Sequence, residues 1–235
     1  MQLLRYSFAR RALAAIAVAS LLWVGCGPSM EGAPAEPSAA APGGATPDAR
    51  RVVLFLGDSL SAGYGLGAEA SFPARIQERI DEARLPFRVV NAGVSGDTTA
   101  GGLRRLDWLL QQPVDTLVIQ LGGNDMLRGL DLEAMRANLR AIAARTREAH
   151  PDAAIVVAGM QAPPNLGPDY ARDYHAAFEA FAAELGAAYI PFLLEGVAMR
   201  PRLNQADGIH PTAEGHEKIA DNVWDVLAPV LRGRG

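Results

Sequence analysis

From Val52 to the C-terminus, short apolar runs alternate with longer amphipathic stretches, and this alternation limits the possible folds more than any other feature of the sequence. The short runs are nearly continuous in apolar residues and rich in Val, Leu and Ile, which is typical of strands buried on both sheet faces. We predict these strands at residues 52–56, 88–91, 116–121, 154–160 and 188–192. The predicted helices cover residues 72–83, 170–185 and 213–227, with one carrying Leu103, Leu106 and Leu110 and another carrying Leu132, Met135, Leu139 and Ile142.

A strict alternation of strands and helices implies a parallel sheet covered by helices on both faces, with right-handed crossovers. The predicted fold class is therefore a three-layer α/β/α sandwich, with residues 51–235 forming one domain. In such a sheet, ligands bind outside the carboxyl ends of the strands, near the point where strand order reverses. Three unusual loops leave the first three strands at this edge, at residues 57–61, 92–102 and 122–125.

Ser59 lies in the first of these loops, in a turn that begins at Gly57 directly after a buried strand. A turn there exposes the hydroxyl at the sheet edge and leaves backbone N–H groups free at the start of the next helix. A serine hydroxyl is a weak nucleophile unless a base activates it. Taken alone, Gly-Asp-Ser is weak evidence, because most such tripeptides are ordinary turns or helix caps.

Asp207 and His210 are candidates for the orienting carboxylate and the base. Three residues apart within one turn, their side chains can meet on the same side. The carboxylate then holds one imidazole nitrogen and leaves the other free to accept a proton. Gly208 and Pro211 stiffen this turn. The same pair also fits a surface contact that caps the last helix.

Gly96 and Asn124 are candidates for stabilising an oxyanion. Acyl transfer builds negative charge on the former carbonyl oxygen, and hydrogen-bond donors must lie about 3 Å from it. The N–H groups of Ser59 and Gly96 and the side-chain amide of Asn124 can converge there, because all three follow strand ends. Each residue alone fits a turn. Together with Asp207 and His210, they indicate a serine hydrolase.

Composition excludes several other classes of protein. Hydrophobic residues make up 49% of the chain, which excludes disorder for most of it. The formal net charge is −4, so a nucleic-acid partner held by a basic face is not expected. One cysteine excludes a disulfide framework and any multi-cysteine metal site, and no histidine pair has H-E-x-x-H spacing. We expect no metal and no cofactor.

A nucleotide-binding module is the rival class, because residues 63–68 loosely fit the G-x-G-x-x-A pattern. These glycines begin too far beyond Leu56 to form the first strand–helix turn. The second predicted strand ends at Asn91, where a nucleotide site needs an acid to bind the ribose. A catalytically silent lipoprotein that binds acyl or glycan ligands is a second rival.

The first 26 residues have the pattern of a bacterial export signal. A positive start is followed by an apolar run at 12–24, which is too short for a membrane span of about 20 residues. The run ends at Gly25-Cys26, which resembles a lipobox and predicts lipidation of Cys26. An ordinary secretory signal is the alternative.

Residues 27–50 are rich in Ala, Pro and Gly and are predicted to form a flexible linker. We therefore expect a periplasmic lipoprotein, anchored to the membrane through Cys26 alone.

The blocks Gly57–Ser61, Val94–Thr98, Gly122–Asp125 and Asp207–Pro211 resemble those of the SGNH (GDSL-type) hydrolases. The resemblance covers residues 52–231. It is closest to the branch of acyl-CoA thioesterase I, protease I and lysophospholipase L1, and to related arylesterases. It implies a five-stranded sheet in the order 2-1-3-4-5, with no cofactor.

The resemblance also implies roles for individual residues. Ser59 is expected as the nucleophile, with Asp207 and His210 completing the triad, and the oxyanion hole is formed by Ser59, Gly96 and Asn124. Residues 125–130 are similar to a mobile loop that adjusts to the acyl chain, so Asp125, Met126 and Leu127 are expected to contact substrate, with Pro163 as a further wall.

The implied substrates are small: acyl and aryl esters, thioesters and lysophospholipids. Glycan O-acetyl esters remain an alternative on the same fold, and a monomer is expected.

Overall fold

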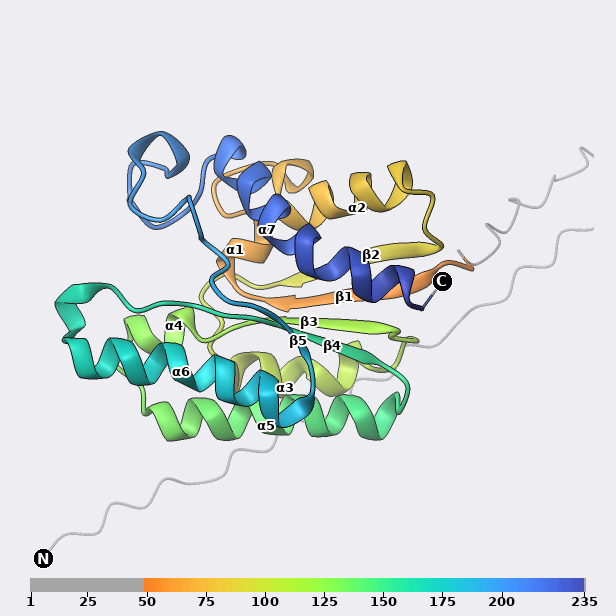
Figure 1. Ribbon diagram of the computed structural model, residues 1–235, viewed down its shortest axis with the longest axis horizontal. Coiled ribbons are helices and arrows are strands. Elements are labelled where there is room, and N and C mark those ends of the chain that lie inside the picture. The colour runs from red at the N-terminus through yellow and green to blue at the C-terminus, as the bar shows by residue number, and fades with distance from the viewer. Residues whose placement is uncertain (1–48, 235) are drawn as a thin grey trace, which may run out of the picture. The chain divides into compact units, whose positions relative to one another are not determined.

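The computed structural model describes residues 49–234 of the chain (Figure 1). The predicted export signal, Cys26 and nearly all of the predicted linker lie outside the described residues. Within them, no helix is both long enough and apolar enough to cross a bilayer.

Five parallel strands form a single sheet in the spatial order β2-β1-β3-β4-β5, as predicted. Strand β1 lies between β2 and β3, with Phe55 opposite Asn91 on one side and Val118 on the other. The strand order reverses at β1, so a ligand site is expected at the carboxyl end of this strand. The strands are β1 (Arg51–Gly57), β2 (Phe87–Gly93), β3 (Thr116–Gln120), β4 (Ala154–Ala158) and β5 (Ala188–Ile190).

Helices cover both faces of this sheet, which confirms the predicted sandwich. In Figure 1, α2 and α7 lie on one face, and α3, α5 and α6 lie on the other. The sheet is buried between these layers: Leu54, Phe55 and Leu56 are fully buried, and the rings of Phe55 and Phe72 pack edge-on at 5.7 Å. The long helices are α2 (Phe72–Glu82), α3 (Thr99–Leu109), α5 (Leu132–Ala149), α6 (Pro168–Leu185) and α7 (Ala213–Arg232).

Side-chain caps fix where three of these helices begin. Thr98 accepts a hydrogen bond from Gly101 N–H at the start of α3, and Thr212 accepts one from Gly215 N–H at the start of α7. Asp131 caps α5 in the same way. Because these residues end the loops that leave the sheet edge, the caps also fix the loops. Ser71 precedes α2, but its hydroxyl donates to the carbonyl of Ala68 at 2.7 Å instead of capping the helix.

Several element boundaries differ from the prediction. β5 ends at Ile190 because Pro191 has no N–H to donate to a sheet, and β4 ends at Ala158, which pairs with Ile190. α7 continues to Arg232, since the buried Leu231 extends its apolar face. Two short helices that follow β1 and β3 were not predicted: α1 (Ser59–Ala62) and α4 (Gly123–Leu127). Three single-turn 3₁₀ segments are η1 (Ala68–Ala70), η2 (Pro164–Leu166) and η3 (Pro201–Leu203).

Candidate active site

Ser59 is the first residue of α1, two residues beyond the end of β1. The turn is tight, since a Cβ added to Gly57 would lie 2.0 Å from the hydroxyl oxygen of Ser61. Asp58 caps α1 by accepting a hydrogen bond from Leu60 N–H at 3.0 Å. Ser59 therefore lies at the carboxyl edge of the sheet, where it lines a cavity. Figure 1 shows α1 directly beyond the end of β1.

Asp207 and His210 form one hydrogen-bonded unit in the segment before α7. The imidazole Nδ1 lies 2.6 Å from Oδ2 of Asp207, whose other oxygen accepts from the N–H groups of Ile209 and His210. These hydrogen bonds lower the pKa of Asp207 to about 2, and the bond from the His210 N–H has the largest effect. Gly208 has a φ of +70°, which lets the turn bring the two side chains together. The carboxylate is therefore ionised at neutral pH and holds Nδ1.

The second imidazole nitrogen faces Ser59. Nε2 of His210 lies 3.0 Å from Oγ of Ser59, within hydrogen-bonding distance. With Nδ1 held by Asp207, Nε2 is the nitrogen that can accept the hydroxyl proton. The ring of Tyr64 packs against the imidazole, with 4.3 Å between ring centroids. Ser59, His210 and Asp207 thus form a continuous hydrogen-bonded chain.

Gly96 and Asn124 reach the same place from the loops after β2 and β3. Gly96 has a φ of +82°, a backbone conformation that favours glycine. Its carbonyl accepts a hydrogen bond from the guanidinium of Arg128 at 2.6 Å. The side-chain nitrogen of Asn124 donates to the carbonyl of Asp97 at 2.9 Å. Both residues line the cavity that contains Ser59 and His210.

A buried polar cluster, formed by Asp58, Ser61 and Gln120, lies beneath Ser59. Gln120 donates to Oδ1 of Asp58 at 3.0 Å, and its own oxygen accepts from the Ser61 hydroxyl at 2.7 Å. Oδ2 of Asp58 lies 3.4 Å from the side-chain nitrogen of Asn124. Burial raises the pKa of Asp58 to about 6. The cluster joins the end of β1 to the end of β3 and so connects the turn of Ser59 with Asn124.

Arg105 on α3 joins the loop after β2 to the end of β1. Its Nε donates to Oδ2 of Asp97 at 2.6 Å, and its Nη2 donates to the carbonyl of Gly57 at 2.9 Å. Gly57 precedes the turn of Ser59, and the carbonyl of Asp97 holds the amide of Asn124. One guanidinium therefore supports both sides of the site.

The cavity above these groups has a volume of about 430 Å³. Much of its wall is apolar, which suits an alkyl or aryl group next to a polar reacting centre. The apolar side chains that line it are Leu60, Met126, Leu127, Met160, Pro163, Leu194, Ala198, Met199 and Ile209.

The family model described as GDSL-like Lipase/Acylhydrolase matches residues 55–218. The chain belongs to this family. Esterase TesA of Pseudomonas aeruginosa PAO1 is 41% identical over 184 residues, covering 78% of this chain and 90% of that protein. The thioesterase 1/protease 1/lysophospholipase L1 of Escherichia coli K12 is 37% identical over 180 residues, covering 76% of this chain and 84% of that protein. A crystal structure of TesA superposes with a TM-score of 0.73 at 40% identity and covers 76% of this chain and 99% of that one.

As a GDSL-like acylhydrolase, the protein is a carboxylic ester hydrolase. Most of the residues predicted for its site lie together. Ser59, Gly96, Asn124 and His210 line one cavity, and Asp207 lies behind the imidazole. The predicted substrate contacts Met126, Leu127 and Pro163 also line this cavity.

Asp125 is the exception among the predicted substrate contacts, because it points away from the cavity. The residue is 3% exposed, and its carboxylate accepts hydrogen bonds from the N–H and the hydroxyl of Thr99 at 2.8 and 2.6 Å. It ties α4 to the start of α3 instead of contacting substrate. The segment 125–130, predicted as a loop, is helical as far as Leu127. It ends in a turn, in which the N–H of Leu130 donates a hydrogen bond to the carbonyl of Asp125.

Sequence reasoning missed four residues of this GDSL-like site: Tyr64, Arg105, Gln120 and Arg128. Gln120 carried a detectable signal, since it is a polar residue that follows the apolar run Leu117–Ile119 in its strand. The other three carried none, because tyrosines and arginines are common on loops and helix faces.

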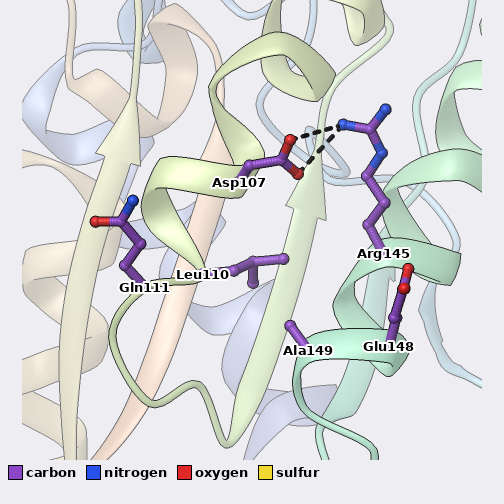
Figure 2. Close-up of a pocket in the computed structure, with 6 residues that line it drawn as sticks. All are labelled: Asp107, Leu110, Gln111, Arg145, Glu148 and Ala149. Carbon is purple, nitrogen blue, oxygen red and sulfur yellow. Dashed lines mark hydrogen bonds and ion pairs between the residues drawn. The ribbon is translucent and has the colours of Figure 1, made fainter.

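A separate hollow of about 400 Å³ lies between α3 and α5, and Figure 2 shows that an ion pair between Asp107 and Arg145 crosses it. None of the catalytic candidates lines it. Within residues 49–234, no group of three or more His, Cys, Asp and Glu side chains is arranged to hold a metal ion. His216 is buried and structural, with Nδ1 accepting from Phe72 N–H at 3.1 Å.

Proposed function

We propose that this esterase works through an acyl-enzyme formed on Ser59. His210 takes the hydroxyl proton as Oγ attacks the ester carbonyl, and Asp207 stabilises the imidazolium that results. His210 then gives the proton to the leaving alcohol or thiol, which departs as the carbonyl re-forms. Water attacks the acyl-enzyme by the same steps and releases the acid.

The N–H groups of Ser59 and Gly96 and the amide of Asn124 form the proposed oxyanion hole. Two of these donors belong to backbone fixed by α1 and by the positive φ of Gly96. Donors that are already oriented cost no reorganisation as charge develops, which is why they lower the barrier.

The observation that carries the proposal is the chain of two short contacts through one imidazole. His210 has Nε2 at 3.0 Å from Ser59 Oγ and Nδ1 at 2.6 Å from Asp207. A surface Asp–His pair that merely caps a helix has no reason to present its second nitrogen to a serine 151 residues away.

The substrates proposed are esters and thioesters with a short to medium acyl chain, aryl esters and lysophospholipids. An apolar cavity of about 430 Å³ supports an alkyl or aryl group of that size. The relatives named for esterase, thioesterase and lysophospholipase activity support the same range. The predicted export signal favours lysolipids of the cell envelope over cytosolic acyl-CoA.

Hydrolysis of p-nitrophenyl acetate and butyrate tests the assignment. Ser59→Ala is expected to lower kcat at least about 10³-fold, since nothing else in the site can replace the nucleophile. Ser95→Ala is the matched control, because Ser95 lines the same cavity without a proposed role.

A fluorophosphonate probe separates chemistry from folding. The wild-type protein should gain one covalent adduct on the peptide that contains Ser59, and the Ser59→Ala protein should gain none. Equal turnover in the wild-type and Ser59→Ala proteins would remove Ser59 from the mechanism.

A further inference from the structure

Met199 has an unusual backbone and an unusual position. It lies in the segment between β5 and α7, with a φ of +60° and 87% of its surface exposed. A large side chain rarely adopts this left-handed conformation, which costs free energy for any residue with a Cβ. Apolar side chains gain nothing from such exposure. The position is therefore unfavourable for the methionine on both counts.

The surrounding structure holds this conformation in place. The buried amide of Asn204 donates to the carbonyls of Val197 and Arg200, on either side of Met199, at 2.7 and 2.9 Å. Asn204 also pairs with Pro211, the residue after His210. The turn that carries Met199 is thus fastened to the segment that carries the proposed base. Strained residues fixed in this way gather at functional sites.

Met199 lies where four hollows meet. Two of them are the cavity that contains Ser59 and a neighbouring cavity of about 430 Å³. The neighbouring cavity has apolar walls at Ala162 and Phe192 and polar groups at Glu195 and Arg200. The two cavities share the lining residues Gln161, Pro163, Leu194, Ala198 and Met199.

We propose that Met199 is a specificity-determining residue that limits the length of the acyl chain. The inference rests on the proposed function. The flexible side chain of Met199 separates the cavity at Ser59 from the neighbouring one, so a short acyl chain stays in the first cavity. Loss of this side chain joins the two cavities and opens an apolar extension along Ala162 and Phe192.

A chain-length series measures this effect. The substrates are p-nitrophenyl butyrate, octanoate, dodecanoate and hexadecanoate, compared by kcat/KM in the full-length protein. Each newly buried methylene raises kcat/KM about threefold to fourfold. Met199→Gly, whose backbone suits a φ of +60°, is expected to raise the dodecanoate-to-butyrate ratio at least about tenfold.

Three variants control for other effects. Met199→Leu keeps the side-chain volume and should keep the wild-type ratio. Met199→Ala should raise the ratio without the added backbone freedom of glycine. Trp108→Ala removes another exposed apolar side chain, 72% exposed on α3 and outside both cavities, and should leave the ratio unchanged.

The outcomes separate this inference from the proposed function. A ratio that stays at the wild-type value, or falls, in both Met199→Gly and Met199→Ala overturns the role of Met199 while Ser59-dependent hydrolysis of butyrate stands. Equal butyrate hydrolysis by the wild-type and Ser59→Ala proteins overturns the proposed function, and the role of Met199 with it.

Discussion

The side-chain nitrogen of Asn124 lies 3.4 Å from the carboxylate of Asp58, a contact too long to be a strong hydrogen bond. The same nitrogen makes a normal bond of 2.9 Å to the carbonyl of Asp97. One hydrogen of the amide is therefore fixed, and the other is held only weakly. This is the arrangement expected of an oxyanion donor, because the second hydrogen can turn to the substrate while the first keeps the amide in place.

Asn124→Ala should lower kcat about 10²–10³-fold, the usual effect of losing one oxyanion donor. KM should change little, since the lost interaction forms mainly in the transition state. Steady-state kinetics on p-nitrophenyl butyrate check this, with a thermal melt to show that the variant folds. Unchanged kcat would exclude Asn124 from the oxyanion hole.

Asp58→Asn should lower kcat about tenfold to a hundredfold. The carboxylate accepts hydrogen bonds from Leu60 N–H and Gln120 on one oxygen, and the other faces Asn124. An asparagine side chain has only one oxygen, so its NH₂ group must face a hydrogen-bond donor. Losing a hydrogen bond to a charged group costs about 1.5–3 kcal/mol. Asp131→Asn, at the exposed cap of α5, is the control and should keep wild-type kcat.

Arg105→Lys should lower kcat about tenfold, with KM nearly unchanged. An ammonium group cannot reproduce the two directed bonds that the guanidinium makes to Asp97 and to the carbonyl of Gly57. Both loops then lose their shared support, and the amide of Asn124 is less well placed. Arg104→Lys, on an exposed position of the same helix, should have no effect. Equal losses in both variants would indicate general destabilisation of α3.

The pH dependence of stability should separate two buried groups with opposite effects. Burial lowers the pKa of His216 from 6.5 to about 4, so between these values the unfolded chain binds the extra proton and acid destabilises the fold. Burial raises the pKa of Asp58 from 3.8 to about 6, so the folded chain binds the extra proton and acid stabilises it. In the wild-type protein these two contributions nearly cancel between pH 4 and 6.

Removing one group at a time should reveal the other. His216→Gln keeps an acceptor for Phe72 N–H but cannot titrate, so its unfolding free energy should rise as pH falls from 6 to 4. Asp58→Asn should show the reverse. Each slope should approach about 1.4 kcal/mol per pH unit, which urea unfolding can measure. Parallel curves for the two variants would show that these groups do not control acid stability.

Apolar patterning predicted most of the fold because the three central strands β1, β3 and β4 are buried on both faces and every long helix has one apolar stripe. It failed where elements are short. Helices α1 and α4 have four and five residues, fewer than periodicity needs to separate a helix from a turn. The end of β5 was overestimated, although Pro191 signals it through its missing N–H.

The candidate site was predictable wherever a residue type carries its own chemistry. A serine, then an asparagine after a strand, then a histidine with a nearby carboxylate are distinctive in this order along the chain. The direction of a side chain is not encoded in that way: Asp125 was expected to face substrate, yet its neighbours on α3 offer two donors and it turns inward. Arg105 could not be predicted, because its partners belong to loops 8 and 48 residues away.

Ser59 and His210 come from opposite ends of the folded region, 151 residues apart along the chain. The proposed nucleophile therefore has no base until the segment before α7 has reached α1. A chain cut short before Asp207 lacks both the proposed base and its orienting carboxylate, so we expect it to hydrolyse no ester. Ester hydrolysis thus depends on bringing together two segments that are far apart along the chain.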